Sequence, residues 1–527
     1  MRDLYFDIGI IIFYFVSITT IGLWFGRKEE SMEDFALGGR KIPWWAVLAS
    51  IIAAETSAAT FLGAPAEGYR TQSLLYVQLT LGTILARIIV ALLFIKPYYE
   101  YKVYTVYEFL QKRFGQVSRI SGSLIFLVTR VLASGVRLYI ASVVLVIAYK
   151  YLTGASPTLT QYIVAISIMA GVTAIYTMLG GIKAVIWTDL IQACIMFGSA
   201  LFSIVTILHL IPGGWDGIRQ GTSNFANFKV VTTGLHGERT LYEALTSIFR
   251  QEYTIWAALI GSTFLTMSTH GTDQDMVQRM LTATDYKRSR RSLILSGLAD
   301  IPVATAFVTI GILLYAYFRV KPDASLPAAD NEVFAYFIIN HMPVGIRGLI
   351  IAGVFATAMG SFSAALNALA TSFVKDFYTP YMKKNGSDTH YILAARVFTA
   401  VFAILMVLVA SIAAYQVMHN PKKTIIPMAL GIIGYTYGSL LGMFLIGMLT
   451  KNRGNDVGNV IAMVCGFLGV MVLSGTANSV IGFFNSAFGF QIPVFNLPEV
   501  AFTWYIMFGT IITFTVGVMF RTKSKER

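Results

Sequence analysis

The chain has 527 residues, of which 56% are hydrophobic and only 13% are charged, and its mean hydropathy is +0.67. Soluble domains carry about 25% charged residues, so this composition excludes a soluble globular protein and indicates an integral membrane protein. The net charge of +13 is dispersed over short loops and forms no basic groove, so it does not indicate a nucleic-acid partner.

Apolar runs long enough to cross a bilayer recur along the whole chain, separated by short polar loops. The first run, residues 6–25, lacks a small-residue cleavage site at its end, so we expect it to remain as a helix rather than be removed as a signal peptide. Further spans are predicted at 43–69, 73–98, 118–149, 158–179, 184–211, 253–271, 292–318, 345–373, 391–415, 424–449, 457–475 and 499–520. The sequence therefore predicts thirteen spans.

The basic residues are distributed unevenly between the two sides of this predicted bundle. The loops that carry most of them alternate so that all fall on one side: 26–41, 111–119, 285–292, 376–386, 449–454 and 520–527. Lys422 and Lys423 are the main exception on the other side. Because short basic loops stay in the cytoplasm, we predict a cell-membrane protein with its N-terminus outside and its C-terminus in the cytoplasm.

The second span contains AAETSAATFLGAPAEGY, residues 53–69, in which polar groups enter an apolar helix. The polar side chains before its proline include Glu55, Thr56, Ser57 and Thr60. Non-helical backbone at membrane depth is tolerated only where it is buried in protein or lines a cavity, and Gly63 and Pro65 permit such a break. A charged side chain in a span costs about 2.5–3.5 kcal/mol, so Glu55 is a functional candidate, with a structural ion pair as the alternative.

Two later spans also contain clustered polar residues. Residues 260–275, IGSTFLTMSTHGTDQD, interrupt an apolar segment five spans after the first. Two interrupted helices, each the first of five predicted spans, indicate an inverted-repeat transporter. Such a transporter binds substrate and ions where the helices unwind. In residues 354–378, Thr357, Ser361 and Ser363 lie among alanines and glycines. This pattern suits either close helix packing or an ion site, because hard cations take oxygen ligands.

These segments resemble the sodium/solute symporters, a family that includes sodium-driven sugar, proline, iodide, vitamin and sialic acid transporters. The resemblance covers nearly the whole chain and rests on FALGGRKIPWW, ETSAATFLGAPAEGY, MLGGIKAVIWTDLIQ, TDQDMVQRMLTA and AMGSFSAALNALATSFVKDFY in this order. It implies an all-α bundle of thirteen helices that works by alternating access. The implied parts are an extra helix at 6–25, a five-plus-five inverted-repeat core of the sodium/leucine transporter type at 43–449, and two C-terminal helices at 457–520.

The resemblance also implies the ligands of a transported sodium ion. Matching the motifs assigns the principal site to Ala53, Thr56, Thr357 and Ser361. Many members carry Ser or Thr where this chain has Gly360, and this difference removes one hydroxyl ligand. Three interpretations follow: a water fills the gap, the site is weak, or protons replace sodium in the coupling.

Some relatives hold a second sodium with an aspartate and further serines, which Asp189 and Ser363 match. Gly360 and Ala364 replace two of the hydroxyls of that pattern, so we do not expect a second tightly bound sodium. Asp189 then has two possible roles: it guides ion release, or it pairs with a nearby base such as Lys183.

The residue most informative about the solute is Arg137, which lies deep in the fourth span and matches the carboxylate clamp of sialic acid transporters. A guanidinium binds a carboxylate through two parallel hydrogen bonds; the alternative is that Arg137 pairs with Glu55. The substrate candidates are Glu55, Ser57, Thr60, Gln78, Arg137, Thr266 and Ser268. Glu55 replaces a threonine that contacts sialic acid in that relative, so a sugar, a zwitterion or another carboxylate-bearing solute is equally compatible.

The sequence thus predicts a secondary active symporter that imports a small polar organic solute together with sodium, which is transported rather than held as a cofactor. We expect it to act as a monomer in the lipid bilayer. The alternatives are a proton-coupled or sodium-independent carrier of the same fold, or a transporter-like nutrient sensor. No HExxH, P-loop or GxSxG motif occurs, so we do not expect an enzyme.

Overall fold

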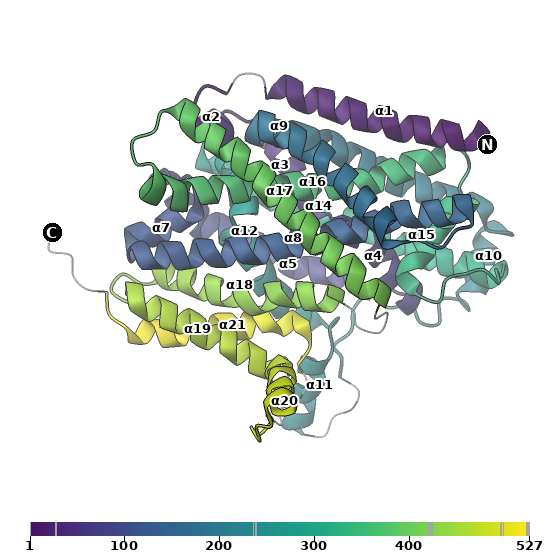
Figure 1. The fold of residues 1–527 in the computed structure, drawn as a ribbon. Coiled ribbons are helices and arrows are strands. Elements are labelled where there is room, and N and C mark those ends of the chain that lie inside the picture. Colours follow the sequence, from purple (N-terminus) through teal and green to yellow (C-terminus); the bar gives the residue numbers. More distant parts are fainter. Residues whose placement is uncertain are drawn as a thin grey trace.

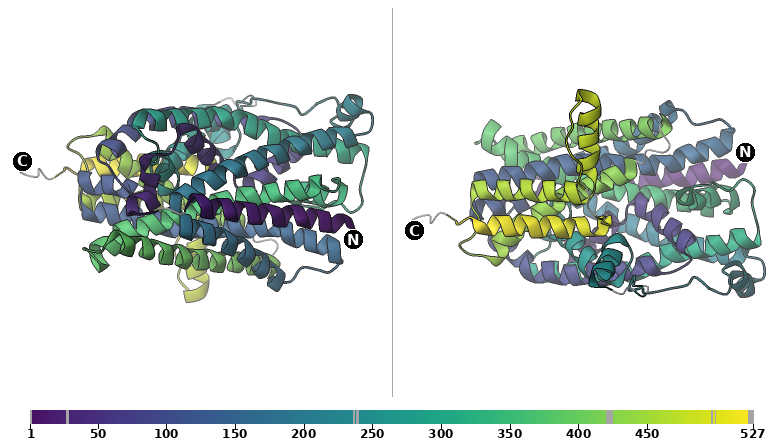
Figure 2. Two further views of the ribbon diagram at one scale, coloured as in Figure 1. Left: turned by 90° about the horizontal axis from the view of Figure 1, so that it is seen from above. Right: turned by 90° about the horizontal axis from the view of Figure 1, so that it is seen from below.

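The structure is a computed structural model that describes residues 2–26, 29–235, 237, 240–419, 425–495, 498 and 500–522. All of the named elements in these residues are helices. The helices run mostly along one long direction of the bundle, and the first described helix starts at the opposite end of it from the point where the last described helix ends (Figures 1 and 2).

The first half of the chain contains α1 (Arg2–Phe25), α2 (Met32–Leu37), α3 (Trp44–Glu55), α4 (Ala58–Thr71), α5 (Leu79–Leu93), α6 (Ile95–Glu100), α7 (Val106–Arg113), α8 (Gln116–Thr153), α9 (Leu159–Leu210), α10 (Gly214–Gly221) and α11 (Leu241–Arg250). The second half contains α12 (Ser262–Gly271), α13 (Gln274–Leu281), α14 (Tyr286–Val320), α15 (Asp330–His341), α16 (Ile346–Ser372), α17 (Asp388–His419), α18 (Ile425–Leu449), α19 (Asp456–Leu473), α20 (Thr476–Phe488) and α21 (Tyr505–Met519). Short 3₁₀ or π turns occupy Gly38–Arg40, Leu75–Gln78, Ala257–Gly261, Phe373–Met382 and Phe502–Trp504.

Nine helices in the described part of the chain are long and apolar enough to cross a membrane, and the bent pair α3–α4 makes ten. Helix α9 has 52 residues and is interrupted at Gly181, where φ is 51° and ψ is −150°. A helix of that length extends about 78 Å, which exceeds two crossings of a hydrocarbon core about 30 Å thick. The count of thirteen spans and the inverted repeat remain predictions.

The second predicted span is broken, but at a different place from the one its glycine and proline suggested. Helices α3 and α4 meet at an angle of 64° across Thr56 and Ser57. Gly63 and Pro65 lie inside the continuous helix α4, so the assignment of the break to these two residues was wrong. The chain leaves the helical path next to Glu55, within the polar cluster itself.

The interruption in residues 260–275 lies at the end of a helix. The π turn Ala257–Gly261 continues directly into α12, which ends at Gly271. Thr272 and Asp273 then depart from helical geometry before α13 begins. All eight residues of α13 are buried, although four of them in QDMVQRML are polar or charged. A buried polar helix needs internal partners, and these lie at the centre of the bundle.

The basic loops gather at one end of the molecule, as the charge pattern predicted. A backbone bridge joins Ile42 to Ala283, and another joins Arg453 to Arg521. Arg113 donates hydrogen bonds to the carbonyls of Thr450 and Lys451 at 2.9 and 2.6 Å. Arg27, Lys28, Lys422, Lys423 and residues 523–527 lie outside the described residues.

Helix α16 forms the centre of the bundle because its small side chains allow close approach on several faces. Nearly all of its residues are buried, and it packs against α1, α3, α8, α9 and α17. Helix α3 also packs against α9. The break after α3 therefore faces α16 and α9 together.

Candidate functional site

The break between α3 and α4 leaves a backbone carbonyl without a hydrogen bond. The Thr56 amide still donates to Ile52 at 3.1 Å, whereas Ser57 begins the next helix by accepting the Thr60 amide at 2.9 Å. No hydrogen bond to the Ala53 carbonyl occurs among the described residues. Ala53 is buried, and a buried carbonyl without a donor is uncommon in proteins. This oxygen is available to a cation.

Helix α16 presents three hydroxyl groups from the third polar cluster. Thr357 donates to the Val354 carbonyl at 2.8 Å, Ser361 to Ala358 at 3.0 Å, and Ser363 to Gly360 at 3.0 Å. The three side chains are buried. A hydroxyl that donates its only proton keeps its lone pairs, so each of these oxygens is oriented to accept, as a cation ligand must.

The carbonyl oxygen of Ala53 and two side-chain oxygens lie close to Gly360. A Cβ atom at Gly360 would lie 2.9 Å from Gln192 Oε1, 3.3 Å from Asp189 Oδ1 and 3.5 Å from the carbonyl oxygen of Ala53. Both side-chain oxygens are buried and have no hydrogen-bond partner in the described part of the chain. Three acceptors therefore border the space that a side chain would fill. Gln192 was not among the expected site residues, although it lies in the quoted motif three residues after Asp189.

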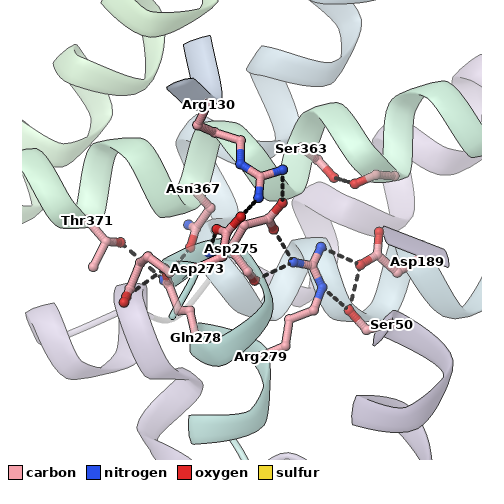
Figure 3. A network of polar contacts seen from close by, with 12 residues as sticks. Ser50, Arg130, Asp189, Asp273, Asp275, Gln278, Arg279, Ser363, Asn367 and Thr371 are labelled. Carbon is pink, nitrogen blue, oxygen red and sulfur yellow. Dashed lines mark hydrogen bonds and ion pairs between the residues drawn. The ribbon is translucent and has the colours of Figure 1, made fainter. Parts of the chain in front are cut away.

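The second oxygen of Asp189 is engaged in a polar network. Asp189 Oδ2 accepts a hydrogen bond from Ser50 Oγ at 2.6 Å and pairs with Arg279 at 3.1 Å (Figure 3). Lys183 instead binds Asp34 at 2.8 Å. The suggested pairing of Asp189 with Lys183 was therefore wrong, and its basic partner comes from α13.

Helix α13 connects this network to α8. Arg279 also pairs with Asp275 at 2.6 Å, and Asp275 pairs with Arg130 at 3.2 Å (Figure 3). Arg130 forms a second ion pair with Asp273, which also accepts a hydrogen bond from Tyr437 at 2.6 Å. All of these side chains are buried. Breaking such a network by removing one partner would leave an uncompensated buried charge.

The partner of Glu55 is an arginine other than the predicted one. Glu55 forms an ion pair with the fully buried Arg87, which also binds Asp300 at 2.9 Å. His270 Nε2 lies 3.8 Å from the Glu55 carboxylate. The proposed pairing of Glu55 with Arg137 was therefore wrong. The side chain of Glu55 remains 30% exposed, so part of the carboxylate borders open space.

Arg137 is half-buried in α8 and forms no hydrogen bond or ion pair with any described residue. Arg130 lies about two turns earlier on the same helix and pairs with two carboxylates. A guanidinium within a bundle is costly without a counter-charge. Arg137 is thus the arginine of α8 without a carboxylate partner among the described residues.

The remaining candidates differ in how their polar atoms are occupied. The Gln78 side chain donates to the Tyr253 carbonyl at 3.0 Å and accepts from the Thr232 amide at 3.4 Å, so it connects the 3₁₀ turn before α5 to these two segments. Ser268 donates to Leu265 at 2.7 Å. Ser57 and Thr266 are buried, and Thr60 is half-buried.

The chain is similar to known proteins over most of its length. A family model described as the sodium:solute symporter family matches residues 35–466. The sodium/sialic acid symporter SiaT of Proteus mirabilis (strain HI4320) is 29% identical over 487 residues, which is 91% of each chain. Human sodium-coupled monocarboxylate transporter 1 is 27% identical and covers 85% of this chain and 69% of its own length. The solved outward-open, substrate-bound state of a Na+-coupled sialic acid symporter is similar with a TM-score of 0.80 and 25% identity, covering 98% of this chain and 97% of that one.

Proposed function

The chain belongs to the sodium:solute symporter family, and we propose that it imports a small carboxylate-bearing solute together with sodium. Its relatives are sodium-driven transporters, so the protein is a multi-pass membrane symporter and not an enzyme. Sodium is its transported co-substrate. The solute, the individual site residues and the path of the ion are the subject of the proposal.

The proposed sodium site lies between the break in α3–α4 and helix α16, with Ala53, Thr56, Thr357 and Ser361 as ligands. The observation that carries this proposal is the unpaired Ala53 carbonyl, which lies close to Gly360 of α16. Sodium is a hard cation, and carbonyl and hydroxyl oxygens can replace its hydration shell. The hydroxyls of Thr357 and Ser361 donate within their own helix and so keep lone pairs for the ion.

Asp189 and Ser363 are proposed to take part in the path of ion release. Asp189 Oδ1 and Gln192 Oε1 are unpaired acceptors beside Gly360, which supports a role for both in receiving the ion where the family hydroxyl is missing. One sodium suffices as a driving force. Roughly 2.3 kcal/mol per charge at 100 mV and about 1.4 kcal/mol for a tenfold gradient together permit several-hundredfold accumulation.

The proposed anchor of the solute is the guanidinium of Arg137. It is the arginine of α8 that lacks a partner in the described chain, and a carboxylate would supply one. The names of two relatives refer to sialic acid and to monocarboxylates, and both kinds of solute carry a carboxylate. Glu55, with its exposed carboxylate edge, is proposed to accept a hydroxyl or ammonium group of the same solute. Ser57, Thr60, Gln78, Thr266 and Ser268 are proposed to surround it.

The proposed architecture is the thirteen-helix bundle with a five-plus-five core at residues 43–449. The bent pair α3–α4 and the interruption after α12 begin the two proposed repeats. The 52-residue length of α9 supports its division into the fourth and fifth core helices.

The experiment is a comparison of two variants by thermal stabilisation, because a ligand that binds the folded state raises the unfolding temperature. Purified protein is tested with carboxylate solutes and with their neutral amides, each in sodium and in choline buffer. We expect carboxylates, but not amides, to stabilise the protein, and only in sodium. Arg137→Met should abolish this effect and retain the stabilisation by sodium alone.

Ser361→Ala should give the converse result, a higher sodium requirement with solute recognition retained at high sodium. Stabilisation of Arg137→Met by the same carboxylates would overturn the proposed anchor. Equal stabilisation of the natural protein in choline would overturn the proposed coupling of solute binding to this sodium site.

A further inference from the structure

Helix α20 projects from the side of the bundle and lies across the direction of α19 and α21 (Figure 2). None of its residues is buried. Val480, Phe483, Phe484 and Phe488 are exposed by 41–63%. At 100° per residue these four side chains share one face, and Asn478 and Asn485 lie on the opposite one. The helix thus presents an aromatic face that remains exposed.

The chain around α20 contains no charge. Between Asp456 and Glu499 there is no Asp, Glu, Lys, Arg or His. A water-facing helix normally carries charged side chains, and contiguous exposed apolar patches mark interaction surfaces. The absence of charge also argues against an acidic or basic partner, because such a surface offers no electrostatic complementarity.

The length of α19 determines how far α20 lies from the basic end of the molecule across the membrane. Helix α19 begins at the basic end of the molecule, beside the Arg453–Arg521 bridge, and has 18 residues. It therefore extends about 27 Å, close to the thickness of the hydrocarbon core of about 30 Å. Gly475 turns the chain with φ of 72°, and α20 starts at the next residue. This start lies at the membrane interface opposite the basic loops.

The exposed surface of α19 leads directly to that interface. Ile461, Val464 and Leu468 are exposed on α19 and follow one face of the helix with the spacing of a lipid-facing stripe. The aromatic face of α20 begins where this stripe ends. The two surfaces are continuous along the chain.

The segment that follows α20 folds back and satisfies its backbone groups internally. The Asn478 side chain donates to the Phe495 carbonyl and accepts the Phe495 amide, both at 2.8 Å. The Asn485 side chain makes the same pair of bonds to Ile492, both at 3.0 Å. Backbone groups in an apolar medium must be paired within the protein. These asparagines provide that pairing for the backbone groups of Ile492 and Phe495.

We propose that residues 476–495 form an in-plane anchor whose aromatic face is inserted into the lipid interface of the outer leaflet. Phenylalanine side chains on one face of a helix that lies in the plane of the bilayer bury their area among the acyl chains below the headgroups. The anchor would hold the outer ends of α19 and α21 at a fixed depth. Because the segment is uncharged, its insertion depends on apolar area and not on anionic lipid or on salt.

The test is a depth measurement with spin labels in vesicles of neutral phosphatidylcholine that contain the purified protein. Cys194 and Cys465 are first replaced by serine, and single labels are placed by Phe484→Cys and Phe488→Cys. The controls are Val464→Cys on the lipid-facing stripe of α19, Ser325→Cys on an exposed loop, and Ser486→Cys on the polar flank of α20 itself. The ratio of collisions with oxygen to collisions with a water-soluble nickel chelate gives the depth of each label, and retained stabilisation by sodium shows that each variant is folded.

We expect the ratios at 484 and 488 to be several-fold above that at 325 and near that at 464, with 486 close to 325. Ratios at 484 and 488 equal to that at 325 would overturn the proposal. The proposal would also be overturned if the labels at 484 and 488 were shielded from the nickel chelate only in native membranes, because that result would indicate a protein partner. Shielding that disappears when the labelled protein is diluted with further lipid would show instead that two copies cover each other.

Discussion

Gly360 lacks a side chain at the point where Ala53, Asp189 and Gln192 direct their oxygens toward one space. In the sequence, this glycine indicates the loss of a hydroxyl ligand. In the structure it also has the opposite effect, because it leaves room among three acceptors that a side chain would occupy. Both effects concern the ion rather than the solute.

We predict that Gly360→Ala raises the sodium concentration needed for half-maximal uptake by about tenfold, equivalent to about 1.4 kcal/mol. The added methyl group would lie 2.9 Å from Gln192 Oε1 and must displace it. The measurement is solute uptake into vesicles across a range of sodium concentrations. Gly171→Ala, where nothing lies within 4 Å of the added atom, is the matched control and should keep the natural requirement. An unchanged requirement in Gly360→Ala would contradict a role for this space.

Arg87 and Arg137 are both intramembrane arginines, but only Arg87 has partners. We predict that Arg87→Met lowers the free energy of unfolding by about 3–5 kcal/mol, because it leaves the carboxylates of Glu55 and Asp300 without their cation. Arg137→Met breaks no ion pair and should unfold within a few degrees of the natural protein. Thermal unfolding of both variants in sodium without solute distinguishes them. Equal loss of stability in the two would mean that Arg137 has a structural partner.

The sequence contains a signal for the role of Arg87. A single arginine in the apolar run LTLGTILARIIVALL is as improbable in lipid as Glu55, and such residues pair with one another. Asp300 is likewise an ionisable residue within a predicted apolar span. The pairing of each arginine with its carboxylate was not predictable. Arg87, Arg130 and Arg137 all lie in apolar helices, and the packing of the helices determines which side chains meet.

At the scale of elements, the break after α3 shows the limit of reasoning from local propensity. Gly63 and Pro65 are the residues with the lowest helix propensity in the segment, and yet they lie within α4. Thr56 and Ser57 are not strong helix breakers. Their departure from the helix is maintained by the packing of α3 against α9 and α16, a tertiary effect that a single sequence does not reveal. The existence of a break next to the polar cluster was predictable from the cost of burying polar groups.

The first turn of α14 contains a cap whose contribution depends on pH. Asp285 accepts hydrogen bonds from the amides of Arg288 and Lys287 at 3.0 and 2.9 Å. The Arg288 amide is the main cause that lowers the pKa of Asp285 below its ordinary value, and the Lys287 amide adds to it. A lowered pKa in the folded state means that the stabilisation is present above the unfolded pKa and is lost as the pH falls through the folded one.

We predict that Asp285→Ala weakens the first turn of α14 by about 1 kcal/mol at neutral pH. Hydrogen exchange of the amides of residues 287–289 should therefore be faster in the variant. The difference from the natural protein should shrink as the pH falls through the lowered pKa of Asp285, where the carboxylate of the folded protein becomes protonated. Asp285→Asn keeps an acceptor oxygen and should retain most of the protection with little pH dependence. Equal exchange in all three proteins at neutral pH would show that the cap contributes nothing.

For the whole molecule, the charge pattern predicts the orientation. The basic loops meet at the end that contains Arg521, and the chain begins at the opposite end (Figure 2). We predict that a cysteine at Ser325 reacts with a membrane-impermeant maleimide on intact cells, whereas one at Asn452 reacts only after permeabilisation. Both are placed in a background without Cys194 and Cys465. The reverse pattern would contradict the expected cytoplasmic location of the basic end.

The global architecture was largely predictable, because spans of apolar residues and the order of the motifs describe the helical bundle and its family. The predicted C-terminal spans at 457–475 and 499–520 overlap α19 and α21, but the segment between them was left unassigned. Its helix α20 has too few apolar residues to form a span and no charge to mark it as a loop. Likewise, TDQDMVQRMLTA indicated the family without revealing that α13 is buried at the centre of an ion-pair network.

That network has an electrical consequence. The network contains two arginines, Arg130 and Arg279, and three aspartates, Asp189, Asp273 and Asp275. When all five groups are ionised, its net charge is one negative charge. A sodium ion beside Asp189 would cancel that charge, and its departure would restore it. The membrane potential does about 2.3 kcal/mol of work per elementary charge per 100 mV. Voltage should therefore act on movements of this network when it is empty and much less when it is loaded, so that the ion serves as a removable counter-charge as well as a source of energy.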